Sequence, residues 1–192
     1  MDAYLAESEI VDFSHPAVRE LAETLARGRG SKEAVAKACF EYVRDAIAHT
    51  GDAGEGVTTL RASEVLERKT GWCYAKSHLL AALLRANGIP AAFCYQRLSC
   101  SEYEEGIYCL HGLNAIYLEG YGWYRIDARG NKEGVDAQFT PPVERLAFAL
   151  GAKEYDVDGI FAEPLPEVVA SLRQNGTYKE MVGNFPDVAE VT

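Results

Sequence analysis

The stretch TGWCYAKSHLLAALLRANG, residues 70–88, decides the fold. Its second half is almost wholly apolar, and it closes on Asn87-Gly88 with Pro90 beyond. Such an ending is typical of a helix, because glycine adopts the left-handed turn after the last residue and proline cannot continue the helix. Thr70-Gly71-Trp72 interrupts the helical pattern at the other end. The sequence therefore predicts an apolar helix with Cys73 in its first turn.

The segments on the two sides of this helix follow different patterns. Before it, residues 16–28 and 31–47 repeat apolar positions at helical spacing, and a short helix is expected at 62–68. After it come β-prone runs at 91–98, 107–118 and 123–127, and then a helix that Pro166 opens and Asn175 ends. Helices first and strands afterwards indicate an α+β fold with an antiparallel sheet, rather than alternating parallel units.

Length and composition favour one soluble globular domain. The chain has 192 residues, 48% of them hydrophobic and 25% charged, which suits a single domain over 1–192. We place its core at about 31–130 and a C-terminal extension at about 140–192. The net charge of −10 argues against nucleic acid or an anionic membrane as a partner.

The N-terminus and the cysteines favour a cytoplasmic location. MDAYLAESEIVDF has no basic region followed by an apolar one, and no apolar run approaches the ~18 residues of a membrane span. The five cysteines are odd in number and scattered along the chain. We therefore expect free thiols in a reducing compartment and no structural disulfide.

Cys73 has three interpretations: a metal ligand with His78, a buried thiol, or a nucleophile. Side chains five residues apart on a helix point about 140° away from each other, so Cys73 and His78 do not form a metal pair. No Cys-x-x-Cys or His-x-x-x-His pair completes a site, and we predict no metal and no cofactor. A buried thiol stays possible, since free cysteine is often buried. However, the unpaired N–H groups of a first helical turn stabilise a thiolate, which favours the nucleophile.

A nucleophilic thiol needs a base, and His111 is the histidine whose setting calls for an explanation. It lies within the apolar run YCLHGLNAIYL, where a polar ring requires a partner, although a satisfied core histidine would fit as well. If the hairpin at 119–122 closes with a three-residue loop, His111 and Asp127 share a face one diagonal step apart, and their side chains can meet. A four-residue loop would put them on opposite faces.

Two longer segments, GWCYAKSHLLAALLRANGIPAA and HGLNAIYLEGYGWYRIDARGN, resemble the transglutaminase-like superfamily, and most closely its bacterial cysteine-protease-like members. The stretches FEYVRDAIAHTGD and RASEVLERKTG are also similar to that group, so the resemblance covers roughly residues 35–130. It implies Cys73 as nucleophile, His111 as base and acid, and Asp127 as orienting residue, on a papain-like α+β core with extra helices at both ends. Trp72 departs from the small or polar residue common in the family.

The resemblance implies a thiol enzyme that transfers an acyl group from an amide, through a thioester. Hydrolysis of a peptide, protein or small amide is the expected reaction. An amine-accepting transglutaminase, which cross-links or deamidates, and a catalytically inactive binding domain are the alternatives, while a redox role lacks a resolving cysteine. For the second donor to the oxyanion we name Tyr95 and Gln96, beside the backbone N–H of Cys73. Trp72 and Trp123 are candidates for the cleft wall.

Overall fold

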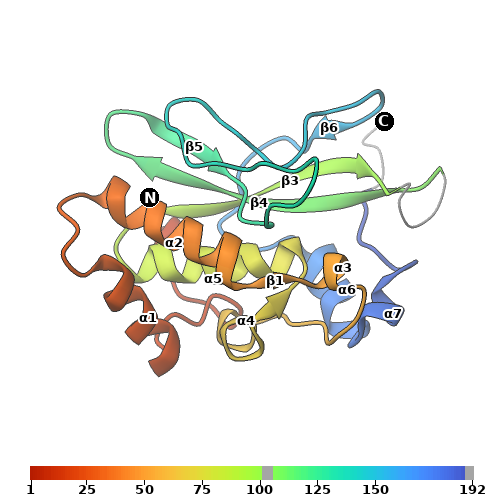
Figure 1. The fold of residues 1–192 in the computed structure, drawn as a ribbon, viewed down its shortest axis with the longest axis horizontal. Helices are drawn as coiled ribbons and strands as arrows, with labels where there is room; N and C mark the ends of the chain where they lie inside the picture. The colour runs from red at the N-terminus through yellow and green to blue at the C-terminus, as the bar shows by residue number, and fades with distance from the viewer. Residues whose placement is uncertain (101–105, 189–192) are drawn as a thin grey trace.

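The computed structural model of the protein describes residues 1–100 and 106–188. A four-stranded antiparallel sheet covers one side of a layer of helices (Figure 1). The sheet has the order β5-β4-β3-β6. Its strands are β3 (Ala91–Ser99), β4 (Tyr108–Leu118), β5 (Gly122–Ile126) and β6 (Tyr155–Asp156). The structure confirms the α+β fold and the three expected strands to within one residue at each end.

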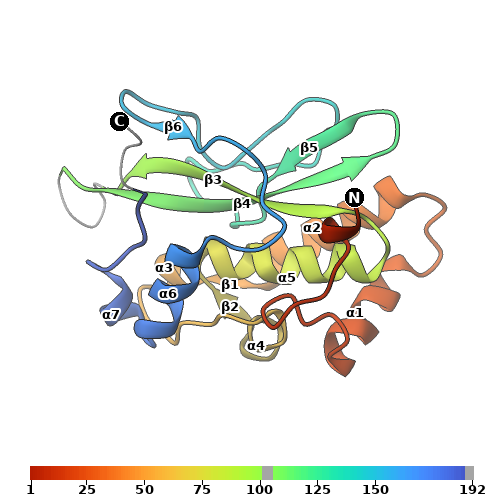
Figure 2. The ribbon, with the colours of Figure 1, turned by 180° about the vertical axis from the view of Figure 1, so that it is seen from behind.

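The helices lie under the sheet with α5 (Cys73–Ala86) at their centre (Figure 1). Seen from behind, α1 (Pro16–Ala26) and α4 (Ala62–Arg68) pack at one side of α5, and α6 (Pro166–Gln174) and α7 (Tyr178–Met181) lie toward its N-terminal end (Figure 2). The remaining helical segments are α2 (Lys32–Ala46), the short α3 (Thr50–Ala53) and a 3-10 turn at Asp2–Tyr4. The expected helices at 31–47 and 62–68 are therefore present, and Ser31 caps α2 by accepting a hydrogen bond from the N–H of Ala34 at 3.1 Å.

Helix α5 is buried on all sides, because every residue from Cys73 to Arg85 is shielded from solvent. Its polar side chains are satisfied by backbone groups of other elements. Lys76 donates to the carbonyls of Ile47 and Arg44, and the Nδ1 of His78 lies 2.7 Å from the carbonyl of Leu60. His78 thus has a local packing role, as its position on the helix predicts. These contacts tie the end of α2 and the segment before α4 to the central helix.

Two very short strands support the start of α5. Strands β1 (Ala48–His49) and β2 (Thr70–Gly71) pair in parallel, with Ala48 opposite Thr70 and His49 opposite Gly71. Trp72 then caps α5, and Cys73 is its first helical residue. A Cβ on Gly71 would come within 3.2 Å of both Ala75 Cβ and Thr59 Oγ1, so the chain can approach the helix this closely only with glycine there.

The cysteines require a correction. Cys100 and Cys109 form a disulfide, with their Cα atoms 6.0 Å apart, while Cys39, Cys73 and Cys94 are free. The expectation of five free thiols was wrong because the antiparallel register, which sets Ser99 opposite Tyr108, brings the two flanking cysteines together. A disulfide is typical of oxidising compartments, so the cytoplasmic expectation loses its cysteine argument. Among the residues that the structure describes, no helix has the length and apolarity to cross a membrane.

Candidate active site

The thiol of Cys73 lies between the N-terminus of α5 and strand β4. Cys73 exposes 7% of its surface. The N–H of Gly112 points at its Sγ, with the two atoms 3.4 Å apart. This close approach depends on the absence of a side chain at position 112, so α5 and β4 meet directly at the thiol.

Gly112→Ala is expected to destabilise the protein by about 2 kcal/mol, because the new methyl group overpacks this contact. Its Cβ would lie 3.0 Å from Cδ1 and 3.1 Å from Cα of Tyr74, and the backbone atom has no room to move. Urea unfolding followed by circular dichroism measures the change. Gly30→Ala is the matched control, since nothing lies within 4 Å of its added Cβ. Equal stability of the Gly112 variant and the wild type would contradict this packing.

His111 and Asp127 come from neighbouring strands and meet side by side. Leu118 pairs with Gly122, which leaves the three-residue loop that brings the two residues onto one face. The Nε2 of His111 lies 2.7 Å from Oδ2 of Asp127. Asp127 is fully buried and also accepts hydrogen bonds from the N–H groups of Arg129 and Ala147, each at 3.1 Å. The carboxylate therefore has a fixed orientation toward the imidazole.

The electrostatics of the pair favour a charged imidazole. Burial works against the charge on His111, but Asp127 and Cys73, through their charges and their hydrogen bonds to the ring, outweigh it and raise its pKa to about 10. Burial likewise opposes the charge on Asp127, yet His111 and the two backbone donors keep the pKa of that carboxyl below its ordinary value. Phe148 packs edge-on against the imidazole, with centroids 5.0 Å apart, and shields it from water. At neutral pH, His111 is consequently an imidazolium beside the Cys73 sulfur.

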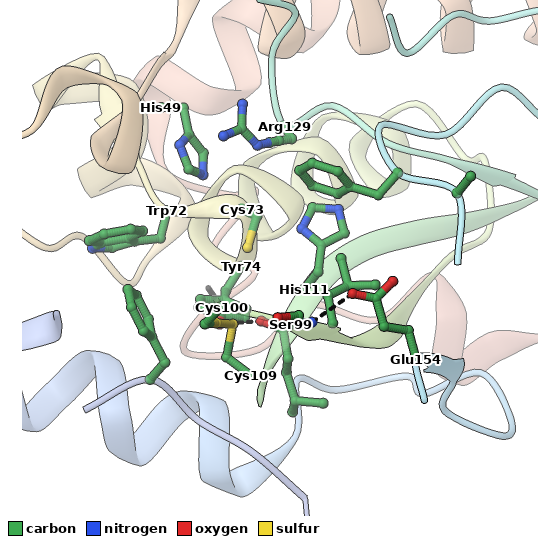
Figure 3. A pocket seen from close by; sticks show the side chains of 15 residues that line it. His49, Trp72, Cys73, Tyr74, Ser99, Cys100, Cys109, His111, Arg129 and Glu154 are labelled. Atoms are coloured by element: carbon green, nitrogen blue, oxygen red, sulfur yellow. Dashed lines mark hydrogen bonds between the residues drawn. A yellow bond between two sulfur atoms is a disulfide. The ribbon is translucent and has the colours of Figure 1, made fainter. Parts of the chain in front are cut away.

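Cys73 and His111 open into a cavity of about 320 Å³ (Figure 3). Its walls combine aromatic rings, the Cys100–Cys109 disulfide and a few polar groups. The residues with prominent side chains in the wall are His49, Trp72, Tyr74, Leu98, Arg129, Phe148, Glu154 and Phe185. A thiol in the wall of a concave cavity with apolar and polar lining is an arrangement that suits a small-substrate or side-chain binding site.

Trp72 connects the start of α5, where Cys73 lies, to the C-terminal part of the chain. Its ring stacks on Tyr178 at 5.8 Å between centroids and meets Phe185 edge-on at 5.2 Å. Beyond Phe185 the chain runs along β4, where the carbonyl of Pro186 accepts a hydrogen bond from the N–H of Leu110 at 2.8 Å. The C-terminal extension therefore supplies one wall of the cavity, and the unusual Trp72 is its anchor.

The other three residues named for the cleft or the oxyanion do not line the Cys73 cavity. Tyr95 is buried and its hydroxyl accepts a hydrogen bond from Leu165 N at 3.1 Å. Gln96 donates to Asp156 at 3.0 Å and lines a separate, more open cavity. Trp123 packs on Tyr4, with ring centroids 4.8 Å apart. Trp123 shares the face of Asp127 but lies four residues earlier in the chain, at the start of β5, where its ring packs against the N-terminal turn instead of lining the cavity.

Sequence reasoning missed several polar residues of the cavity, among them His49 and Arg129. Arg129 makes two hydrogen bonds of 2.7 Å to Asp52, and its guanidinium lies 5.5 Å from the centre of the Phe148 ring. The β1–β2 pairing positions His49. Strands of two residues are too short to give a recognisable pattern in the sequence. The described residues contain no group of three or more His, Cys, Asp or Glu side chains placed to hold a metal ion.

Comparison with solved structures shows similar folds at low sequence identity. A candidate cysteine protease from Cytophaga hutchinsonii aligns with a TM-score of 0.52 and 18% identity over 66% of this chain and 40% of its own. The periplasmic domain of TgpA from Pseudomonas aeruginosa gives 0.47 and 21% over 65% of this chain and 45% of its own. The chain thus spans less than half the length of each of these two structures. None of the proteins with curated functions matches the chain.

The sequence profile of the transglutaminase-like superfamily matches residues 19–128, more than half of the chain. The match includes Cys73, His111 and Asp127, and it contains α5 and the strands β3 to β5 that hold these residues. It also begins earlier than the resemblance noted at 35–130. This protein belongs to the transglutaminase-like superfamily.

Proposed function

We propose that the protein is a thiol-dependent acyl-transfer enzyme that hydrolyses an amide or peptide-type bond through a thioester on Cys73. The observation that carries the proposal is the position of His111, which is held by Asp127 at 2.7 Å and lines the same cavity as Cys73, close enough for the two groups to interact electrostatically. In this proposal Cys73 is the nucleophile, His111 the base and Asp127 the orienting carboxylate of a catalytic triad. Membership of a superfamily that includes thiol enzymes supports the same conclusion.

The proposed reaction begins with transfer of the Cys73 proton to His111. Cys73 then attacks the carbonyl carbon through its sulfur, forming a C–S bond and placing the negative charge on the oxygen. His111 then gives its proton to the leaving amine as the C–N bond breaks. In the second half, His111 takes a proton from water, and the hydroxide releases the acid and restores the thiolate. Asp127 keeps the imidazole in place throughout.

The cavity supports a substrate that presents one amide group, on a peptide, a protein side chain or a small molecule. Its volume of about 320 Å³ is at the low end of the range for small-molecule sites. Phe148 and Phe185 provide apolar contact on two sides, while Arg129 and Glu154 are the charged groups of the wall. Transfer to an amine shares the first half of the reaction and differs only in the acceptor.

The test is formation of an acyl-enzyme on Cys73. The protein is incubated with p-nitrophenyl acetate and with a library of peptide amides and thioesters, and intact mass and peptide mapping locate the acyl group. We expect the added mass on Cys73 in the wild type and its absence in Cys73→Ala. Release as free acid supports hydrolysis, whereas transfer to an added amine such as methylamine would assign the transglutaminase reaction. A wild-type protein that never becomes acylated would contradict the enzyme proposal and favour a binding domain.

A further inference from the structure

His49 is a second imidazole in the wall of the Cys73 cavity, and the mechanism above gives it no part. His49 is the last residue of β1. It pairs with Gly71, which precedes Cys73 by two residues in the sequence. The side chain exposes only 7% of its surface. In Figure 3 its ring lies on a different side of Cys73 from His111. Two imidazoles therefore line the cavity beside the thiol.

The hydrogen-bonding environment of His49 indicates which ring nitrogen carries its proton. Its Nδ1 is buried and has no hydrogen-bond partner in the described part of the chain. The Asp52 Oδ2 atom lies 3.7 Å away, beyond hydrogen-bonding distance. Asp52 is instead engaged by Arg129 at 2.7 Å and Lys132 at 2.8 Å. Since no hydrogen bond holds a proton on Nδ1, we assign the ring the Nε2–H tautomer, which the neutral histidine side chain prefers in water.

The surroundings also keep the ring neutral. Burial, followed by the charge of Arg129, holds the pKa of His49 well below its ordinary value, and Asp52 opposes these effects without reversing them. Lys76 and His111 add to the positive field. His49 is thus uncharged at neutral pH and leaves the ion pair with the thiolate to His111. A neutral imidazole donates a hydrogen bond to a developing oxygen anion without bringing a competing charge.

We propose that His49 donates the second hydrogen bond to the oxyanion through Nε2–H, beside the backbone N–H of Cys73. The inference rests on the acyl-transfer function proposed above. When the thiolate adds, the carbonyl π electrons move to the oxygen, on the side of Cys73 away from His111. His49 and the first N–H of α5 stabilise that charge until the electron pair returns and the leaving group departs with the proton of His111. His49 keeps its own proton throughout.

The experiment separates oxyanion binding from thiolate reactivity. The rate of Cys73 acylation by p-nitrophenyl acetate and the rate of its alkylation by iodoacetamide are measured in the wild type, His49→Leu and His49→Gln. We expect His49→Leu to acylate about 100-fold more slowly. His49→Gln should acylate at least about tenfold faster than His49→Leu, because the amide N–H of glutamine reaches the region of the histidine Nε2. Alkylation should change less than about twofold, since displacement of iodide develops no oxyanion.

His78→Gln is the matched control, because His78 is also a fully buried histidine but lies outside the cavity. Its acylation rate should equal that of the wild type. If His49→Leu does not fold, His49→Asn replaces it; the shorter amide cannot reach the position of Nε2 and should acylate more slowly than His49→Gln. Wild-type acylation in the His49→Leu protein overturns the proposal, as does an equal loss of acylation and alkylation. Absence of acyl-Cys73 in the wild type overturns the proposed function itself, so the two failures are distinguishable.

Discussion

Replacing His111 with alanine is expected to slow the acylation of Cys73 about 1000-fold. The imidazole accepts the thiol proton and supplies it to the leaving group, and it is the side chain that Asp127 holds at 2.7 Å in the wall of the Cys73 cavity. Acylation by p-nitrophenyl acetate measures the change. Alkylation of Cys73 by iodoacetamide at pH 7 should also fall, by at least about tenfold.

Two other thiols of the chain serve as internal controls for that measurement. Burial raises the pKa of both Cys39 and Cys94 to about 12, so neither should be labelled at pH 7 in the folded protein. If each chain takes up one iodoacetamide label and peptide mapping places it on Cys73, the labelling rate measures the reactivity of Cys73 alone. A His111→Ala protein that is acylated and alkylated at wild-type rates would contradict the assignment of the base.

Asp127→Asn is expected to lower both activity and stability. The acylation rate should fall by about 100-fold or more, because an amide does not hold the imidazolium in place. The free energy of unfolding should decrease by about 3 kcal/mol at pH 6, as His111 loses the partner of a buried ion pair and two backbone donors lose a carboxylate. Urea unfolding and the ester assay measure the two effects. Ser63→Ala is the control, because it removes a hydrogen bond to the carboxylate of Asp12, and neither residue lines the cavity. This variant should have the wild-type acylation rate.

The stability difference between wild type and Asp127→Asn should depend on pH. The folded-state pKa of His111 is raised to about 10, above the unfolded value near 6.5, so the pair's contribution is fully present below pH 6.5. It is lost as the pH rises toward 10, because the folded wild type then releases the proton. The difference should therefore be largest near pH 5–6 and shrink between pH 7 and 10. A difference that stays constant over this range would contradict a charged His111.

Much of the fold follows from local patterns in the sequence. The apolar run and the Asn87-Gly88 ending define α5, and β-prone runs between turn residues define β3, β4 and β5. The disulfide depends on the register of β3 and β4, which the spacing of cysteines along the chain does not reveal. In that register, Cys100 follows the last paired residue of β3 and Cys109 lies near the start of β4.

The site was predictable where residues share one element or neighbouring strands, and not elsewhere. A three-residue loop between β4 and β5 sets a register in which His111 can meet Asp127. The position of Cys73 follows from the predicted start of its helix. His49 and Arg129 reach the same cavity through contacts distant in the sequence, the β1–β2 pairing and the Asp52 network. The direction of a large side chain such as Trp123 depends on packing against the chain's N-terminus, which no local pattern encodes.

The cavity wall is assembled from segments of two different kinds. Cys73, His111 and Asp127 lie within residues 19–128, which the superfamily shares, whereas Phe148, Glu154 and Phe185 of the wall lie beyond them. Substitutions of Glu154 or Phe185 can therefore alter which molecules fit, whereas Phe148 also contacts His111. Trp72, which lies within the shared residues, packs on Tyr178 and Phe185 and so fixes this part of the wall relative to Cys73.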